Sequence, residues 1–176
     1  MKKIIFLLLL IPSLTFAQMT KRDSLWMPMK PFVGDWSGTG DGEPGPGKYE
    51  RSYEFILGKR FIEVKNKSVY EPKAGKTEGE IHEDRGFISY DKSRKNFILR
   101  QFHLEGFVNQ FALESISEDG KKIVFTTESI ENLPAGFRAR ETYQFINDNE
   151  FEETFELAEP GKDFFIYSTV KLKRKE

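Results

Sequence analysis

Apolar side chains recur at every second position through most of the chain after Gly34, and short turn sequences separate the runs. A period of two is typical of half-buried β-strands, whereas an amphipathic helix repeats every ~3.6 residues. Glycine, proline, asparagine and aspartate mark the turns, because these residues adopt turn conformations at low cost. The pattern predicts ten strands, at residues 34–41, 48–57, 60–71, 77–91, 95–104, 106–117, 121–129, 137–147, 150–158 and 163–173.

Consecutive strands joined by short turns predict an antiparallel up-and-down sheet, and closure of that sheet would remove its exposed edges. We therefore expect an all-β barrel of about ten strands, formed by residues 34–176 as a single domain. Ten strands exceed the roughly eight whose side chains fill a barrel interior, so an internal cavity is expected. Residues 18–33, with Pro28 and Pro31 following Trp26, predict a short helical plug over one end of the barrel.

Polar residues interrupt the apolar face of several predicted strands. Glu153 lies between Phe151 and Phe155 at a spacing of two, and Glu141 and Arg51 occupy similar positions on their own strands. A buried ionisable side chain is costly unless it is paired or hydrated. These side chains could therefore anchor the polar group of a ligand, or form ion pairs inside the barrel or at its mouth. We predict a ligand cavity lined by Arg51, Tyr53, Phe55, Val64, His82, Arg100, Asn109, Phe111, Glu141, Tyr143, Glu153 and Phe155.

The strand at 95–104 is interpreted with Ile98, Arg100 and Phe102 on its inner face, which places His103 on the opposite face as a partly buried histidine. Further apolar wall is expected from Ile62, Phe125 and Ile166. An apolar cavity with a few polar groups is typical of small-molecule sites. The predicted function is non-catalytic binding of a small, largely apolar molecule, with no cofactor required.

Catalytic motifs do not appear in the chain. It lacks cysteine, a Gly-x-Ser-x-Gly motif and a His-Glu-x-x-His motif. Glu141 and Glu153 lie on neighbouring predicted strands and leave an acid–base pair open as an alternative. An enzymatic activity is therefore not predicted.

Glu78, Glu80, His82 and Asp84 alternate along one predicted strand and could suggest a metal site. Side chains on the same face of a strand are ~6.5 Å apart, so the four cannot converge on one ion. The pattern favours a solvated acidic face, and no metal is predicted.

Charge and composition limit the classes of partner. The chain has 27 basic and 28 acidic residues and a formal net charge of −1. Binding of nucleic acid normally requires a basic stripe, so we expect no nucleic-acid partner. Because the chain has no cysteine, no disulfide can stabilise it, and stability must come from packing that includes 17 phenylalanines.

The first 17 residues have the form of a secretory signal peptide. Two lysines precede an uncharged apolar run at 4–11, and Thr15-Phe16-Ala17 provides a small-residue cleavage site. The run is far shorter than the ~20 residues of a membrane-spanning helix. We expect cleavage near Ala17, no membrane span in the mature chain, and a periplasmic or secreted protein.

Several motifs occur in the order found in a known group of barrels. They are the pair Gly34-x-Trp36, the segments 57–61 (Leu-Gly-Lys-Arg-Phe) and 86–91 (Gly-Phe-Ile-Ser-Tyr-Asp), and a basic last strand. Over residues 28–175 the chain resembles a lipocalin-like bacterial family of calycin barrels with no assigned activity, related to the nitrobindin-type haem-binding barrels. The resemblance implies that a basic residue of the last strand covers Trp36 and closes the barrel. The expected closure residues are Gly34, Trp36, Lys171, Lys173 and Arg174.

His82-x-Asp84-x-Gly86-Phe87 also resembles a nitrobindin motif whose histidine lies on the distal side of haem. In that family the axial histidine comes from the last strand, where the corresponding position here falls at or next to Tyr167. Strand alternation predicts that Tyr167 faces outward with Lys171. The resemblance implies a haem-binding barrel that handles nitric oxide or peroxynitrite as the alternative function. An interaction module of the cell envelope is a third possibility.

Overall fold

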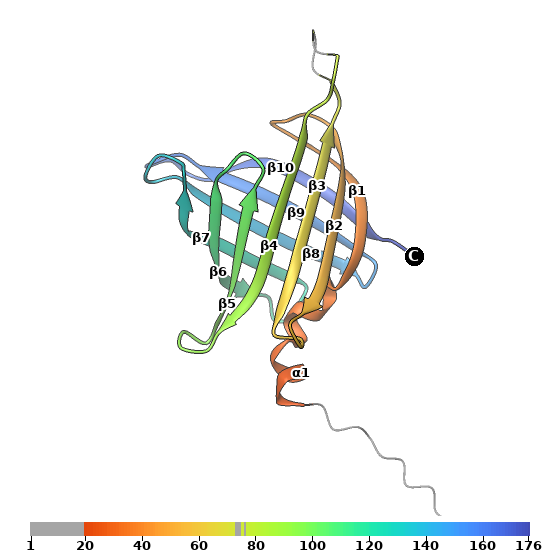
Figure 1. The fold of residues 1–176 in the computed structure, drawn as a ribbon, viewed down its shortest axis with the longest axis vertical. Coiled ribbons are helices and arrows are strands. Elements are labelled where there is room, and N and C mark those ends of the chain that lie inside the picture. The colour runs from red at the N-terminus through yellow and green to blue at the C-terminus, as the bar shows by residue number, and fades with distance from the viewer. Residues whose placement is uncertain (1–19, 73–74, 76) are drawn as a thin grey trace, which may run out of the picture.

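Ten antiparallel strands close into one barrel in chain order, with β10 paired to β1 (Figure 1). The computed structural model describes residues 20–72, 75 and 77–176, so the predicted signal peptide lies outside the described residues. The all-β barrel expected from the sequence is confirmed. Its strands are β1 (Gly34–Gly42), β2 (Gly47–Ile56), β3 (Phe61–Tyr70), β4 (Ile81–Asp91), β5 (Asn96–His103), β6 (Val108–Ile116), β7 (Lys122–Glu131), β8 (Arg138–Asn147), β9 (Glu150–Ala158) and β10 (Phe165–Arg174).

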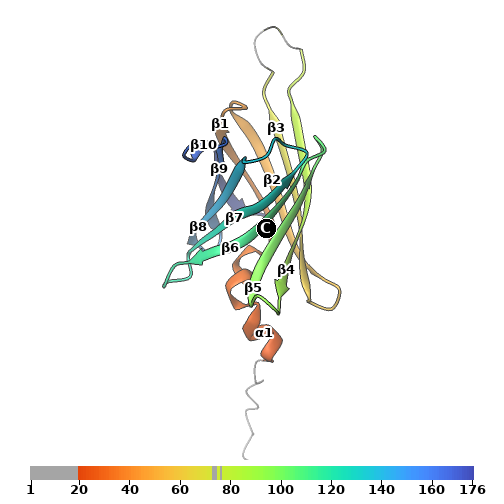
Figure 2. The ribbon, with the colours of Figure 1, turned by 90° about the vertical axis from the view of Figure 1, so that its left-hand side faces the viewer.

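A short helical segment covers one end of the barrel, opposite the end from which the β3–β4 hairpin extends (Figure 2). It consists of α1 (Lys21–Leu25) and the 3-10 helix η1 (Met27–Phe32), and the Thr20 hydroxyl caps α1 by accepting a hydrogen bond from the Asp23 amide. Trp26, Met29 and Phe32 are buried. The expected N-terminal helical segment is therefore confirmed, and its apolar side chains fill this end of the barrel.

Trp36 on β1 is fully buried where the plug enters the barrel. Its Nε1 donates a hydrogen bond to the Phe32 carbonyl at 2.7 Å, and the Arg174 guanidinium lies 4.1 Å from the indole centroid. A cation over an indole face is stabilising. Gly34 has a φ of +132°, and a Cβ atom there would lie 2.4 Å from Arg174 Nη1. The structure therefore places Gly34, Trp36 and Arg174 together at this end.

Lys171 and Lys173 do not take part in this closure, which corrects the sequence prediction. Both side chains are exposed, while Leu172 between them is buried. Successive side chains of a strand point to opposite faces, so both lysines face solvent. Arg174 reaches Trp36 because it ends the strand and donates hydrogen bonds to the carbonyl groups of Pro31 and Val33.

An apolar core fills the half of the barrel next to the plug. Phe32 packs within 4.8–6.2 Å of four aromatic rings, measured between ring centroids: Tyr53, Tyr143, Phe145 and Phe151. None of the described helices is long and apolar enough to cross a membrane. The other half of the barrel carries the candidate site.

Candidate functional site

A cavity of about 350 Å³ lies inside the barrel, away from the plug. This volume falls at the lower end of the ~300–1,000 Å³ that is typical of small-molecule sites. One part of the lining is apolar and comes from β7, β9, the β5–β6 loop and the β7–β8 loop: Phe107, Ile130, Leu133, Phe137, Phe155 and Leu157. The strands from β2 to β6 contribute polar side chains, including Arg51, Asn66, Ser68, His82, Asp84, Gln101, His103 and Asn109.

Six of the twelve predicted cavity residues line this space: Arg51, His82, Asn109, Glu141, Glu153 and Phe155. Tyr53, Val64, Phe111 and Tyr143 also point inward but are buried in the core. Phe55 is partly buried against the plug, where Trp26 packs edge-on to its ring at 5.4 Å. Of the three further wall residues, Ile62 and Phe125 lie in the core, and Ile166 is exposed. Strand alternation identified an inner face on these strands, but it does not indicate how far along the barrel a residue lies.

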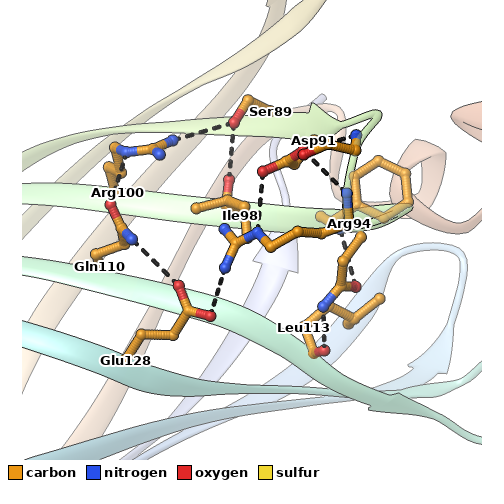
Figure 3. A network of polar contacts seen from close by, with 11 residues as sticks. Ser89, Asp91, Arg94, Ile98, Arg100, Gln110, Leu113 and Glu128 are labelled. Atoms are coloured by element: carbon orange, nitrogen blue, oxygen red, sulfur yellow. Dashed lines mark hydrogen bonds and ion pairs between the residues drawn. The ribbon is translucent and has the colours of Figure 1, made fainter.

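Arg100 was predicted to line the cavity, and the structure places it in a polar network outside it (Figure 3). Its Nε donates to Gln110 Oε1 at 3.0 Å and its Nη1 to Ser89 Oγ at 3.3 Å. The inner residues of β5 are those that alternate with it, among them Gln101. The error arose because Phe97, Ile98 and Leu99 are all buried, so three consecutive apolar residues concealed the alternation.

The prediction that Tyr167 faces outward and Ile166 inward is also wrong. A β-bulge shifts the register between β10 and β9, so that Ile166 pairs with Glu156 and Ser168 with Phe155. The extra residue, Tyr167, lines the cavity, and Ile166 is 61% exposed. A bulge re-aims the side chains next to it, which is the physical reason for the error.

A buried ion pair at the base of the cavity joins β2 to β9, across the two strands β1 and β10 that lie between them in the closed barrel. Arg51 Nη2 lies 2.6 Å from Glu153 Oε1, and Arg51 Nε donates to Glu153 Oε2 at 3.0 Å. Arg51 Nη1 also donates to the carbonyl groups of Glu50 and Lys67. Such additional hydrogen bonds are what a buried ion pair requires. Of the two roles considered from the sequence, Arg51 and Glu153 therefore have the second one, which is an ion pair inside the barrel.

Two further carboxyl groups face the same space. Burial raises the pKa of Glu141 well above its ordinary value, and the charge of Glu153 adds to the effect while Arg51 opposes it. Burial also raises the pKa of Asp84 to about 6, again opposed by Arg51. Burial therefore favours the protonated form of the Glu141 carboxyl group relative to an exposed glutamate. Among the described residues, these buried side-chain oxygens have no hydrogen-bond partner: Tyr53 Oη, Asn66 Oδ1, Gln101 Oε1, Asn109 Oδ1 and Glu141 Oε2.

His103 is a site residue that sequence reasoning missed. Its ring stacks on Phe107 at 4.2 Å, and its Nε2 lies 3.2 Å from Asn109 Nδ2. Burial lowers the pKa of His103 to about 4, so the imidazole is neutral at pH 7. The signal that could have identified it is its alternation with Leu99 and Gln101, which the inverted phase of β5 concealed.

His82 occupies a more acidic part of the lining. Its Nδ1 lies 3.2 Å from Glu105 Oε1, and its Nε2 lies 2.9 Å from Glu80 Oε1 without hydrogen-bond geometry. In the described part of the chain, no group of three or more His, Cys, Asp or Glu residues is arranged to hold a metal ion. Among the described residues, His82 and His103 thus line the cavity as single imidazoles outside any such group.

Comparison with solved structures relates the barrel to proteins of low sequence identity. Rv2717c from M. tuberculosis superposes with a TM-score of 0.62 and 15% identity, over 86% of this chain and 98% of that protein. A redesigned β-barrel, b11L5F_LGL, has a TM-score of 0.43 and 10% identity, over 84% of this chain and 94% of the design. The first likeness supports the fold alone. No curated protein matches the sequence.

The family model described as "THAP4-like, heme-binding beta-barrel domain" matches residues 26–174. This range begins in the plug and ends at Arg174, so it spans both the closure around Trp36 and the cavity. The chain therefore belongs to the THAP4-like family of haem-binding β-barrel domains.

Proposed function

We propose that this protein binds haem in the open half of its barrel. The observation that carries the proposal is His103, a neutral imidazole that lines the same cavity as an apolar wall from β7 to β9. Neutral imidazole is a common axial ligand of haem iron. Family membership supports the same function. When bound, haem would supply an iron whose reactivity depends on the axial ligand and on the polarity of the pocket.

The residues of the cavity fit this group in donor chemistry and in apolar surface. Phe107, Phe137 and Phe155 offer apolar contacts for a flat macrocycle. With a volume of about 350 Å³, the cavity would enclose only part of a tetrapyrrole, whose remainder would occupy the mouth. Arg51 is already paired with Glu153, so its guanidinium would not be free to pair with the haem carboxylates.

Tyr167 is the second candidate iron ligand because the bulge turns it into the cavity. A tyrosine ligates iron as the phenolate. Burial raises the pKa of Tyr167, and acidic neighbours such as Glu80 add to this effect. Loss of its proton is therefore disfavoured, and we propose His103 as the residue that would hold the haem iron.

A haem titration of the purified protein tests this assignment. We expect hemin to give a shifted Soret band at one equivalent, and His103→Gln to weaken binding at least about tenfold with a changed spectrum. His82→Ala and Tyr167→Phe are the comparison variants and should retain the wild-type spectrum. The absence of a Soret shift in the wild type would refute haem binding. Loss of the spectrum only in Tyr167→Phe would show that the tyrosine, and not His103, holds the iron.

The cavity lining also bears on the other functions inferred from the sequence. Binding of a largely apolar small molecule uses the apolar wall but leaves the polar groups around Glu141 without a partner. Reaction of a bound haem with nitric oxide or peroxynitrite stays an expectation based on the resemblance. Measurement of the decay of these molecules with the haem-loaded protein and with free hemin would test it.

A further inference from the structure

Six polar side chains line the cavity where it borders the core, and we refer to them together as the polar floor. They come from six different strands: Arg51, Asp84, Gln101, Asn109, Glu141 and Glu153. Core residues lie on the same strands, two positions closer to the plug. Among them are Tyr53, Leu99, Phe111 and Tyr143. The polar floor therefore separates the packed core from the cavity.

The polar floor has no free cationic donor for an anion. Arg51 is the one Lys or Arg side chain among the described lining residues. Its three nitrogens already donate to Glu153 and to the carbonyl groups of Glu50 and Lys67. One guanidinium is thus shared among the carboxyl groups of Asp84, Glu141 and Glu153. The charge balance favours a cation.

The unpaired hydrogen-bonding groups add a second, independent requirement for the ligand. Among the described residues, Gln101 Oε1, Asn109 Oδ1 and Glu141 Oε2 are buried and have no partner. The three side chains are 2%, 2% and 7% exposed, and Gln101 pairs directly with Asn109 across β5 and β6. Oxygens of this kind accept hydrogen bonds. A molecule that satisfies them must therefore supply donors.

The walls above the polar floor suit the rest of such a molecule. Tyr49, Tyr70, Phe107 and Phe155 line the cavity and provide aromatic surface. Aromatic faces attract cations as well as apolar groups. We propose that the polar floor binds a small organic cation with N–H donors, such as a primary ammonium carried on a short apolar or aromatic body. This site lies beyond the proposed haem function and does not require haem.

Calorimetric titration of the haem-free protein with three matched probes tests the proposal. Benzylamine carries the ammonium group, benzyl alcohol replaces it with a neutral hydroxyl, and benzoate replaces it with an anion. We expect benzylamine to bind, benzyl alcohol to bind at least about tenfold more weakly, and benzoate to give no binding. Equal binding of the amine and the alcohol, or tighter binding of benzoate, would overturn the proposal.

Glu141→Gln tests the polar floor itself, because it removes the acidic group with little change in shape. We expect at least about tenfold weaker binding of benzylamine. Glu128→Gln on the outer network is the matched control and should leave the affinity unchanged. Gln101→Met provides a second variant if Glu141→Gln does not fold, and it should also weaken binding. Unchanged affinity in a folded floor variant would refute the assignment.

Proton release gives a readout that a merely structural role would not change. Burial raises the pKa of Glu141 in the free protein, and a bound ammonium would lower it, so binding should release protons at pH values where Glu141 titrates. The groups facing Glu141 are Arg51, Tyr53, Asp84, Tyr143 and Glu153. Binding enthalpies in phosphate and HEPES should therefore differ for the wild type and agree for Glu141→Gln. Haem binding is measured separately by its Soret band. The haem proposal and the organic-cation proposal can therefore be refuted independently of each other.

Discussion

Arg174 contributes to stability at the scale of a single residue. Its guanidinium covers Trp36 at 4.1 Å and donates to the Val33 carbonyl at 2.6 Å. We predict that Arg174→Met lowers the free energy of unfolding by about 1–3 kcal/mol, since both interactions are lost. Urea unfolding measures this change. Lys173→Met, on the exposed neighbour, should stay within about 0.5 kcal/mol, and an equal loss there would contradict the closure role.

His103 should make stability depend on pH. Its pKa is about 4 in the folded protein, against ~6.5 for an unperturbed histidine, so between these values the unfolded chain binds the extra proton. This contribution is complete above pH ~6.5 and is lost as the pH falls toward about 4. As the pH falls from about 6.5 to about 4, the wild type should lose up to about 3 kcal/mol more unfolding free energy than His103→Gln does.

Asp84 should make stability depend on pH in the opposite direction, so it serves as the control for the His103 prediction. Its pKa is raised to about 6, so the folded state binds the proton between pH ~4 and about 6 and stability falls as the pH rises. Asp84→Asn should therefore make the slope of stability against pH more positive in this window. Urea unfolding at several pH values measures both variants. Slopes that change in the same direction would show that these two groups do not titrate as assigned.

At the scale of elements, the seam between β1 and β10 depends on close backbone contact. A Cβ atom on Gly38 would lie 1.8 Å from the Lys171 carbonyl oxygen, a distance that the paired strands cannot accommodate without moving. We predict that Gly38→Ala destabilises the barrel by about 1–3 kcal/mol, as overpacking does. Thr39→Ala on the exposed neighbour is the control in thermal unfolding. Equal effects of the two substitutions would argue against a close seam.

At the scale of the whole molecule, the barrel separates a stabilising half from a binding half. Phe32 contacts Tyr53, Tyr143, Phe145 and Phe151 in the packed half and does not line the cavity. We predict that Phe32→Ala costs about 3–5 kcal/mol in unfolding free energy, yet leaves hemin and benzylamine affinities within about twofold at temperatures where it stays folded. A large loss of affinity in the folded variant would show that the two halves are coupled.

Export and cleavage of the N-terminal segment also concern the whole molecule. We propose that the chain is exported and cleaved after Ala17, as the basic start and the apolar run at 4–11 predict. Mass spectrometry of the protein recovered from the periplasm or medium should find an N-terminus at Gln18. Recovery of the intact chain from the cytoplasm would contradict export.

The sequence by itself determined the class and order of the elements, because strand periodicity and turn residues are local properties. It also predicted the inner faces of β2, β8 and β9, including the inward positions of Arg51, Glu141 and Glu153. The closure by Gly34 and Trp36 followed from a resemblance in motifs. These features depend on residues that lie near one another in the chain.

Only the tertiary structure decided which inward residues meet in the cavity and which join the core. A consecutive apolar run concealed the phase of β5 and thus His103, and a bulge between Ile166 and Ser168 turned Tyr167 inward. The bulge is set by pairing between strands, and the phase of β5 became unambiguous only when burial showed which face points inward. Closure then brought Arg51 to Glu153, 102 positions apart, and left Glu141 beside them. The polar floor therefore exists only because the barrel closes.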